Sequence, residues 1–354
     1  MYNYYGKRRK YSKNTPKELH YMQKIVENRK NIFNENGELT FGGWSKSSLF
    51  EYNKEAHPAE NKITESDSYF ISNSEMAFYL SAEITGSDIN LKVILSDYKT
   101  GEIVRDTVSK RMLLDPVKLP TEDTVGELNY KDKRVALTIT NTVDGKYLKC
   151  DFIDFADTKN LFVKLFLKNT DGDNMNMVSP FEKNKTCFYF KRFAENYTAS
   201  GVVRFGGVDY DINEENSLVY FAKCRYLLSR HRKFQMLSGS VDIGGHKLTI
   251  NLASKVGTNR SGSENCYFVD DKLVKIGRTK VVGDDKSVTG KWTFETPDGS
   301  LELEFTPIET KKGYLACKCD KTTFVVGKLN GYLETDEFRL NLKDKIFHMI
   351  FTNL

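Results

Sequence analysis

Two short polar segments of the chain contain residue types that could bind or act on a ligand. Glu264 and Asn265 end a polar run and precede the apolar segment 266–269, and a carboxylate beside an amide can orient a polar ligand group. His231 lies in the basic run 230–233, whose positive charges disfavour the protonated imidazole, so a neutral ring near pH 7 could bind a ligand. Each has a structural alternative: a loop cap for Glu264 and Asn265, and an exposed connector for His231.

The known motifs of metal sites and enzymes are not complete in this sequence. Cys317 and Cys319 could supply half of a metal site, but no second Cys or His pair follows at a fitting spacing. Alternate residues of a strand share a face, so two small buried thiols are expected there instead. The two glycines of segment 257–262 lack the strand and helix that flank a phosphate loop, and they indicate a turn. We expect no metal and no cofactor, and leave open whether the chain is an enzyme.

The segments that would hold these residues follow one pattern from about residue 70 onward. Apolar and polar residues alternate, as in segments 76–85 and 89–97, which is the period of a half-buried β-strand. Short dipeptides rich in Gly, Asp and Asn separate these segments and permit the positive φ angles of tight hairpin turns. Turns are therefore expected at residues 98–101, Asp144-Gly145, Gly206-Gly207, Gly244-Gly245, Asp270-Asp271, Asp298-Gly299 and Asn330-Gly331.

Residues 15–33 show a helical period instead. Thr15 can cap a helix and Pro16 fits its first turn. The apolar residues that recur at helical spacing are Leu19, Met22, Ile25 and Val26. We therefore predict a short N-terminal helix ahead of the strands.

The chain has 354 residues, which suits two domains. We predict an all-β fold of two tandem antiparallel β-barrel or sandwich domains. An N-terminal extension with the helix covers residues 1–40, the first domain residues 41–200 and the second residues 201–354. The boundary is placed near residue 200 because the polar segment 170–185, which contains Pro180, ends the first run of strands.

Charge and composition exclude several protein classes. The net charge is +5, and Lys, Asp and Glu are interleaved along most of the chain, although residues 7–10 and 225–233 are basic. This dispersed charge disfavours a nucleic-acid partner. No run approaches the roughly 18 apolar residues of a membrane-spanning helix. Six scattered cysteines and the lack of a secretory signal predict a cytoplasmic protein with free thiols.

Several blocks, in order along the chain, resemble the uncharacterised DUF2804 family. Segment 34–53 (NENGELTFGGWSKSSLFEYN) resembles its opening block, with an ENG-type turn before a Gly-Trp element and a Leu-x-x-Tyr-Asn stretch. The later blocks are residues 177–181, similar to an ATPF element, 185–192, similar to FYYNQK, 199–207, similar to ASGxVxFGG, and 264–272, similar to ENxxFxDGK. The resemblance implies a tandem barrel or calycin-like fold, distantly similar to carotenoid hydratases and lipocalin-like proteins that hold apolar small molecules.

The sequence departs from the family pattern in two places. The closing segment 345–354 (KIFHMIFTNL) lacks the family's usual polar, Trp-containing end, and the block at residues 220–234 differs more widely. The family carries an Asp-x-Gly-Arg-Gly stretch followed by a Trp-rich strand, whereas segment 220–224 lacks the Asp and both glycines, and Lys223 replaces the Arg. If this block forms the family's working site, the present chain has lost or changed that activity. The family has no established activity as a whole, so the resemblance implies no catalytic residue.

From these observations we expect a calycin-like protein that binds an apolar or amphipathic small molecule in one barrel. The candidate polar contacts are Lys223, Arg225, His231, Glu264 and Asn265, and the candidate walls are Phe221, Phe234, Tyr267 and Trp292. One alternative is a hydratase, lyase or isomerase acting on an isoprenoid-like substrate, with Glu264 or His231 as the acid, or a catalytically degenerate relative of one. Another is an interaction protein that binds RNA or acidic lipid headgroups through basic surfaces, which the dispersed charge disfavours.

Overall fold

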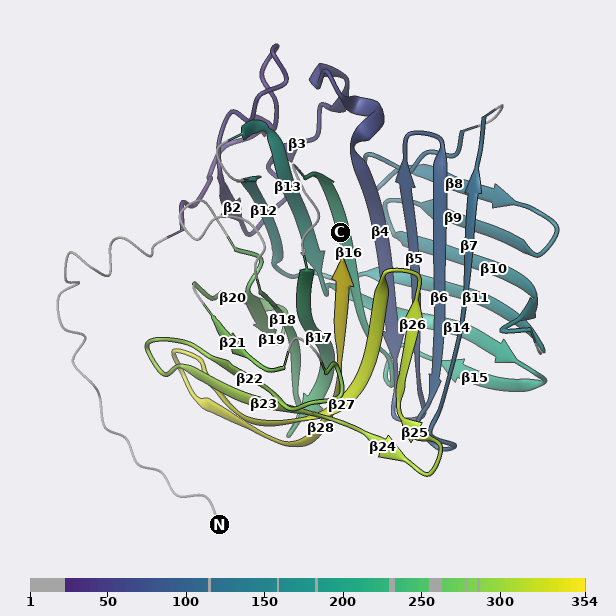
Figure 1. Cartoon of the computed structure of the whole chain (residues 1–354). Helices are drawn as coiled ribbons and strands as arrows, with labels where there is room; N and C mark the ends of the chain where they lie inside the picture. Colours follow the sequence, from purple (N-terminus) through teal and green to yellow (C-terminus); the bar gives the residue numbers. More distant parts are fainter. Residues whose placement is uncertain are drawn as a thin grey trace.

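The computed structural model describes residues 23–113, 116–157, 159–181, 184–228, 233–254, 263–277, 279–284 and 287–353. These residues form β-strands, joined by turns and by two short 3-10 helices, η2 (Lys54–Ala56) and η3 (Glu60–Lys62). The prediction of an all-β fold is confirmed. In the described part of the chain, no helical segment has the length and apolar character needed to cross a bilayer. Figure 1 shows the strands in three large sheets, all antiparallel.

An eight-stranded sheet forms the central layer. Its spatial order is β2 (Gly43–Ser45), β12 (Asn174–Phe181), β13 (Asn184–Ala194), β16 (Leu218–Leu227), β4 (Thr64–Ser72), β5 (Met76–Thr85), β6 (Asp88–Asp97) and β7 (Glu102–Arg111). Strands from two separate parts of the chain meet where β16 pairs antiparallel with β4. Successive residues of a strand point to opposite faces. In β16, Tyr220 packs on one face of the sheet and Phe221 on the other, so both faces are buried.

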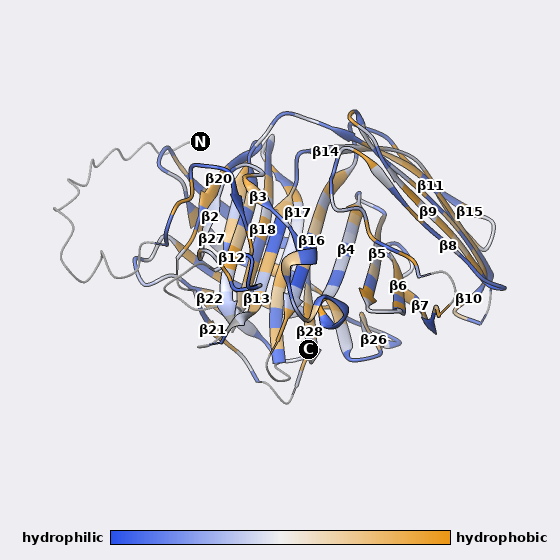
Figure 2. Cartoon of the chain, turned by 90° about the horizontal axis from the view of Figure 1, so that it is seen from above, coloured by the Kyte–Doolittle hydropathy of each residue, from blue (hydrophilic) through white to orange (hydrophobic). Residues whose placement is uncertain are grey.

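A six-stranded sheet covers one face of the central sheet. Its spatial order is β15 (Val208–Ile212), β14 (Tyr197–Phe205), β11 (Lys159–Asn169), β10 (Gly145–Phe155), β9 (Val135–Asn141) and β8 (Gly126–Lys131). Figure 2 shows these strands in a layer beside β4 to β7. Phe78 and Phe221 of the central sheet share one core with Phe152 and Leu165 of the six-stranded sheet. These two sheets therefore form a β-sandwich.

A third sheet, of ten strands, lies against the other face of the central sheet. Its strands are β20 (Lys272–Lys275), β19 (Cys266–Val269), β18 (His246–Ser254), β17 (Lys233–Ile243), β28 (Arg339–Asn353), β27 (Thr322–Glu334), β23 (Leu301–Pro307), β22 (Trp292–Glu295) and β21 (Lys280–Val282), with β26 (Ala316–Cys319) paired to β27. Figure 1 shows β27 and β28 curving strongly. The sheet is a half-barrel around its own core, and its outer face packs on the central sheet.

Two minor pairs complete the fold. They are β1 (Lys30–Asn31) with β3 (Phe50–Glu51), which is parallel, and β24 (Glu309–Thr310) with β25 (Gly313–Tyr314). The predicted N-terminal helix is wrong for residues 23–33, and residues 15–22 lie outside the described residues. The backbone N–H of Val26 donates to the Trp44 carbonyl at 2.8 Å, so this segment is extended. Val26 is buried and Ile25 is 55% exposed, which gives neighbouring side chains opposite faces as in a strand.

Most of the predicted turns are confirmed, because all but one of them join two paired strands. The exception is Asn330-Gly331, which lies inside β27. There the register against β28 shifts between Leu329 and Gly331. Gly331 has a φ of 125°, which marks a bulge. An Asn-Gly dipeptide commonly closes a hairpin. In β27 it bends a long strand, so that the sheet can curl.

The structure shows a sandwich and a half-barrel, not two tandem barrels. Each large sheet is an open path of strands within the described residues. The central sheet does not close on itself because it buries both faces, one in the sandwich and one against the half-barrel. Sheet membership changes between β16 and β17, at residues 227–233. The domain boundary near residue 200 stays a prediction.

Candidate functional site

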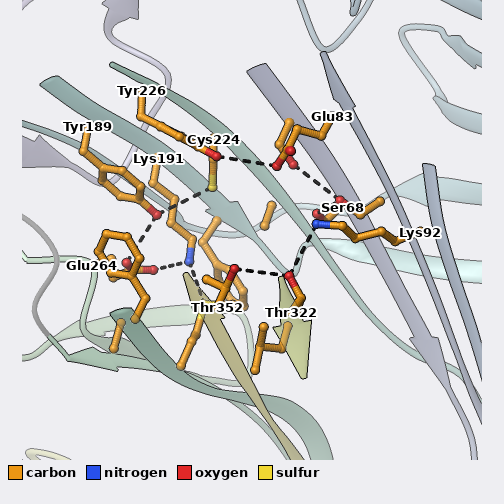
Figure 3. Close-up of a pocket in the computed structure, with 18 of the residues that line it drawn as sticks. Ser68, Glu83, Lys92, Tyr189, Lys191, Cys224, Tyr226, Glu264, Thr322 and Thr352 are labelled. Carbon is orange, nitrogen blue, oxygen red and sulfur yellow. Dashed lines mark hydrogen bonds and ion pairs between the residues drawn. The ribbon is translucent and has the colours of Figure 1, made fainter. Parts of the chain in front are cut away.

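A cavity of about 130 Å³ lies between the central sheet and the ten-stranded sheet. Figure 3 shows the side chains that line it. Its position follows from strand alternation: β13 points Tyr189, Lys191 and Phe193 into it, and β16 points Cys224 and Tyr226 from the neighbouring strand. Strands β17, β18, β27 and β28 close the opposite side. The two sheets do not pack flush here, because polar side chains replace the apolar contacts of the surrounding core.

A buried ion pair dominates one end of the cavity. The side chains of Lys191 and Glu264 are 1% and 2% exposed, and the Lys191 Nζ contacts Glu264 Oε2. Nζ also donates to Asn251 Oδ1 at 2.9 Å, while Asn251 Nδ2 donates to the Glu264 carbonyl at 2.8 Å. The Tyr189 hydroxyl donates to Glu264 Oε1 at 3.3 Å. We call Tyr189, Lys191, Asn251 and Glu264 the ion-pair cluster.

The protonation states of this cluster are fixed by its surroundings. Burial is the largest single influence on Lys191 and lowers its pKa, but the charge and hydrogen bond of Glu264, together with Cys224 and Cys266, outweigh it. The pKa therefore lies above its ordinary value and the ammonium stays charged. Burial raises the pKa of Tyr189 well above its usual range, so this hydroxyl keeps its proton. Burial also raises the pKa of the Cys224 thiol, which lies 3.6 Å from the Tyr189 hydroxyl. The cluster therefore presents protonated donors.

The other end of the cavity is lined by hydroxyl groups and opens toward solvent. The Tyr79 hydroxyl donates to Ser68 Oγ at 3.3 Å, and Lys92 Nζ donates to Thr322 Oγ1 at 3.4 Å. A second hollow of about 570 Å³ adjoins this end and shares Lys92 and three further residues with the cavity. The shared residues are Glu83, Tyr226 and Thr352. The larger hollow therefore lies directly beside the hydroxyl-lined end of the cavity.

Apolar side chains form the wall between these two polar ends. Phe193 comes from the central sheet, and Phe234, Met236 and Ile350 come from the ten-stranded sheet. A molecule in the cavity would thus contact an apolar wall along its length and polar groups at both ends. This is the usual composition of a small-molecule site.

The structure brings together two of the residues predicted for a ligand site. Glu264 belongs to the ion-pair cluster and Phe234 to the apolar wall. Asn265 points away from the cavity: its Oδ1 accepts the Ala253 N–H at 2.8 Å, and its Nδ2 donates to Thr279 Oγ1 at 3.1 Å. Glu264 thus lies in the cavity, whereas its neighbour Asn265 forms hydrogen bonds that hold adjacent segments of the chain together.

The other predicted residues lie elsewhere. Lys223, Arg225 and Phe221 occupy the opposite face of β16, inside the sandwich. Tyr267 and Trp292 are buried in the core of the half-barrel. His231 lies outside the described residues. Their part in ligand binding stays a prediction.

Sequence reasoning missed Tyr189, Lys191, Asn251 and Cys224. Tyr189 and Lys191 stand two residues apart in a segment recognised only as a strand. Because side chains alternate between the two faces of a strand, this spacing predicts that both point to the same face. Their contact with Glu264, more than 70 residues away in the chain, depends on how two sheets pack. As for metals, the described residues contain no group of three His, Cys, Asp or Glu that could hold an ion.

The protein is a stack of three antiparallel sheets with a mixed polar and apolar cavity between two of them. A model of the family described as "Domain of unknown function (DUF2804)" matches residues 23–346, and the chain belongs to this family. No curated protein matches the sequence.

Two solved structures share the fold. One is described as a "putative AttH" from Nitrosomonas europaea, with 12% identity and a TM-score of 0.52 over 82% of this chain and 92% of that chain. The other is kievitone hydratase from Nectria haematococca, with 10% identity and a TM-score of 0.50 over 92% of this chain and 98% of that chain. At these identities the likeness concerns the fold alone.

Proposed function

We propose that the cavity between the central and ten-stranded sheets binds a small amphipathic molecule, in the manner of calycin-like proteins. The observation that carries this proposal is the pairing of an apolar wall with the buried ion-pair cluster at the closed end. An apolar cavity of about 150 Å³ holds a benzene-sized molecule, so 130 Å³ accepts one ring or a short branched chain. The adjoining hollow accommodates the rest of a longer ligand.

The ion-pair cluster supports binding by orienting one polar group of the ligand. Tyr189 already donates its single proton to Glu264, so Lys191 is the donor for a ligand. Two of its N–H groups bond Glu264 and Asn251, and the third faces the weakly accepting Met236 sulfur at 3.3 Å, which a carbonyl, hydroxyl or ether oxygen can replace. Both partners of the ion pair are already matched by each other and by Asn251. A neutral acceptor therefore fits better than a second charged group, which would have to be desolvated without a counterion.

The protonation states favour binding over acid–base catalysis. A catalytic acid or base works best with a pKa near the working pH. The pKa values of Tyr189, Lys191 and Cys224 all move upward, which leaves each group protonated at neutral pH. Groups that keep their protons at neutral pH can orient a ligand without exchanging protons with it.

A second candidate function is a hydratase, lyase or isomerase reaction on an isoprenoid-like or other alkene substrate. The hydrogen bond from Tyr189 to Glu264 favours it, because it places a carboxylate and a proton donor side by side at the closed end. A hydratase also shares the fold. Incubation of the purified protein with alkenes of this class, followed by mass spectrometry, distinguishes the two functions: an enzyme changes the substrate's mass or isomer, and a binder returns it unchanged.

Native mass spectrometry of the protein purified from its own host tests the binding proposal. Ala222 lines the cavity, so Ala222→Leu should fill it, while Ala222→Ser keeps the side-chain volume nearly constant. We expect a co-purifying small molecule on the natural protein and on Ala222→Ser, and its loss from Ala222→Leu. An unchanged complement of bound molecules in folded Ala222→Leu would remove this cavity as the binding site.

A further inference from the structure

A second buried polar group of residues lies on the opposite face of the central sheet, inside the sandwich. Arg192, Lys223 and Asp67 stand directly opposite one another on β13, β16 and β4. Lys146 of β10 faces them from the six-stranded sheet, with Nζ 4.6 Å from the centre of the Phe221 ring. None of these side chains lines the cavity described above, from which the central sheet separates them.

A further cation on this face is paired mainly with another carboxylate. Arg225, also on this face of β16, donates to Asp67 Oδ1 at 2.8 Å and to the Ser66 carbonyl at 3.0 Å. This bond uses the Asp67 carboxylate. Lys146, Arg192 and Lys223 remain, and we call them the three sandwich cations.

The three sandwich cations converge on a single carboxylate, that of Asp123. Lys223 Nζ lies 2.7 Å from Asp123 Oδ1, Lys146 Nζ lies 3.8 Å from the same oxygen, and Arg192 contacts Asp123 Oδ2. The side chains of Lys146 and Lys223 are 0% and 5% exposed. Three buried or nearly buried positive charges thus contact one carboxylate directly. Asp67, already bonded to Arg225, is a second negative charge that acts on all three.

This imbalance leaves the site short of negative charge. Buried charges are normally paired, because an unpaired one loses its hydration without compensation. Arg192 Nε is buried with no hydrogen-bond partner. Burial, and then the Lys223 charge, lower the pKa of Lys146 to about 7. Burial lowers the pKa of Lys223 to about 7, although the Asp67 carboxylate opposes it, and the charges of Arg225 and Arg192 add to the lowering. The surroundings therefore disfavour the charged form of both amines. An additional anion beside them would stabilise that charged form.

The carboxylate that fills the site belongs to a connector and not to a strand. Asp123 lies in the segment between β7 and β8, whose carbonyls accept bonds from the same cations. Lys223 Nζ donates to the Thr121 carbonyl at 2.9 Å, and Lys146 Nζ donates to the Asp123 carbonyl at 3.2 Å. A connector leaves its place at lower cost than a paired strand, so this occupant can exchange.

We propose that Lys146, Arg192 and Lys223 form a carboxylate-binding site inside the sandwich, which Asp123 occupies here and which a ligand carboxylate enters by displacing it. The present occupant sets the ligand class, because the donors are already arranged around a planar carboxylate. A guanidinium beside two ammonium groups matches the two oxygens of such a group. The site is independent of the binding proposed for the other face of the sheet.

Calorimetric titration of the full chain with sodium acetate, against sodium chloride at equal ionic strength, tests the proposal. Asp123→Asn removes the internal competitor and keeps the side-chain shape. We expect acetate to bind this variant at least tenfold more tightly than the natural protein. Glu214→Gln is the matched control, because Glu214 forms an exposed ion pair with Lys168 at 3.2 Å and its loss should change nothing.

Equal acetate affinity in Asp123→Asn and the natural protein, no binding by folded Asp123→Asn, or an equal gain in Glu214→Gln would overturn the proposal. If Asp123→Asn does not fold, hydrogen exchange of the natural protein decides the matter. Acetate, but not chloride, should then accelerate exchange of the amides at residues 121–123. Identical exchange in the two salts would show that Asp123 is a fixed structural partner.

Discussion

Lys191 and Glu264 each depend on the other, because both charges are almost completely removed from water. Removing one partner of a buried ion pair leaves the other charge uncompensated and costs about 3–5 kcal/mol, whereas replacing both partners costs far less. The structure adds that Asn251 and Tyr189 are bonded to the same pair. The stability of this end of the cavity is therefore a property of the cluster.

A double-mutant cycle measures this dependence. We expect Lys191→Met and Glu264→Gln each to lower the free energy of unfolding by about 3 kcal/mol, and the double variant to lose clearly less than the sum. Urea unfolding of the four proteins provides the values. Additive losses would mean that the two side chains do not interact energetically.

Glu195 makes stability depend on pH. It is completely buried, and Lys247 Nζ lies 3.7 Å from its Oε2. Burial raises the pKa of Glu195 to about 7, although Lys247 partly offsets this. Because the folded pKa lies above the unfolded one, the contribution of Glu195 is fully present below the unfolded pKa and is lost as pH rises through about 7.

The variant Glu195→Gln should therefore gain stability relative to the natural protein as pH increases. We expect the difference in unfolding free energy between the two proteins to shift by about 3 kcal/mol in favour of the variant from about pH 4 to about pH 8. Urea unfolding at both pH values measures it. A difference that stays constant with pH would show that Glu195 is ionised in the folded state without penalty.

At the scale of the element, the bulge of β27 shapes the half-barrel. A Cβ at Gly331 would lie 2.1 Å from the Glu302 carbonyl oxygen, and its φ of 125° is unfavourable for other residues. We expect Gly331→Ala to cost more than 3 kcal/mol. Gly245, in the hairpin turn of β17 and β18, has a φ of 88° with nothing within 4 Å, so Gly245→Ala should cost only about 1–2 kcal/mol. Thermal unfolding that ranks the two variants equally would contradict this account of the bulge.

The same elements show what local sequence pattern can predict. Alternation and turn dipeptides located the strands and most hairpins, because both are properties of a few neighbouring residues. They placed Asn330-Gly331 in a turn, since a bulge and a hairpin both favour glycine at positive φ. The helical spacing of apolar residues predicted a helix for residues 23–33, although an extended segment beside Trp44 buries Val26 equally well. Tertiary packing decided both cases.

At the scale of the whole molecule, the central sheet is the feature that local pattern did not reveal. It supplies Phe221 to the sandwich core and Tyr220 to the core shared with the half-barrel. Lys223 and Cys224 are adjacent in sequence, yet they face different sites on the two sides of this sheet. Only the order of strands and the packing of sheets determine which polar residues share a site, so Glu264 was predicted and its partner Lys191 was not.

The central claim is that the space between the central and ten-stranded sheets is a binding site for a small amphipathic molecule. A crystal structure of the protein purified from its own host tests it most directly. We expect electron density for such a molecule against Phe193, with an acceptor oxygen within hydrogen-bond distance of Lys191 Nζ. A cavity filled only by ordered water, with a co-purified molecule bound at another place on the protein, would contradict the claim.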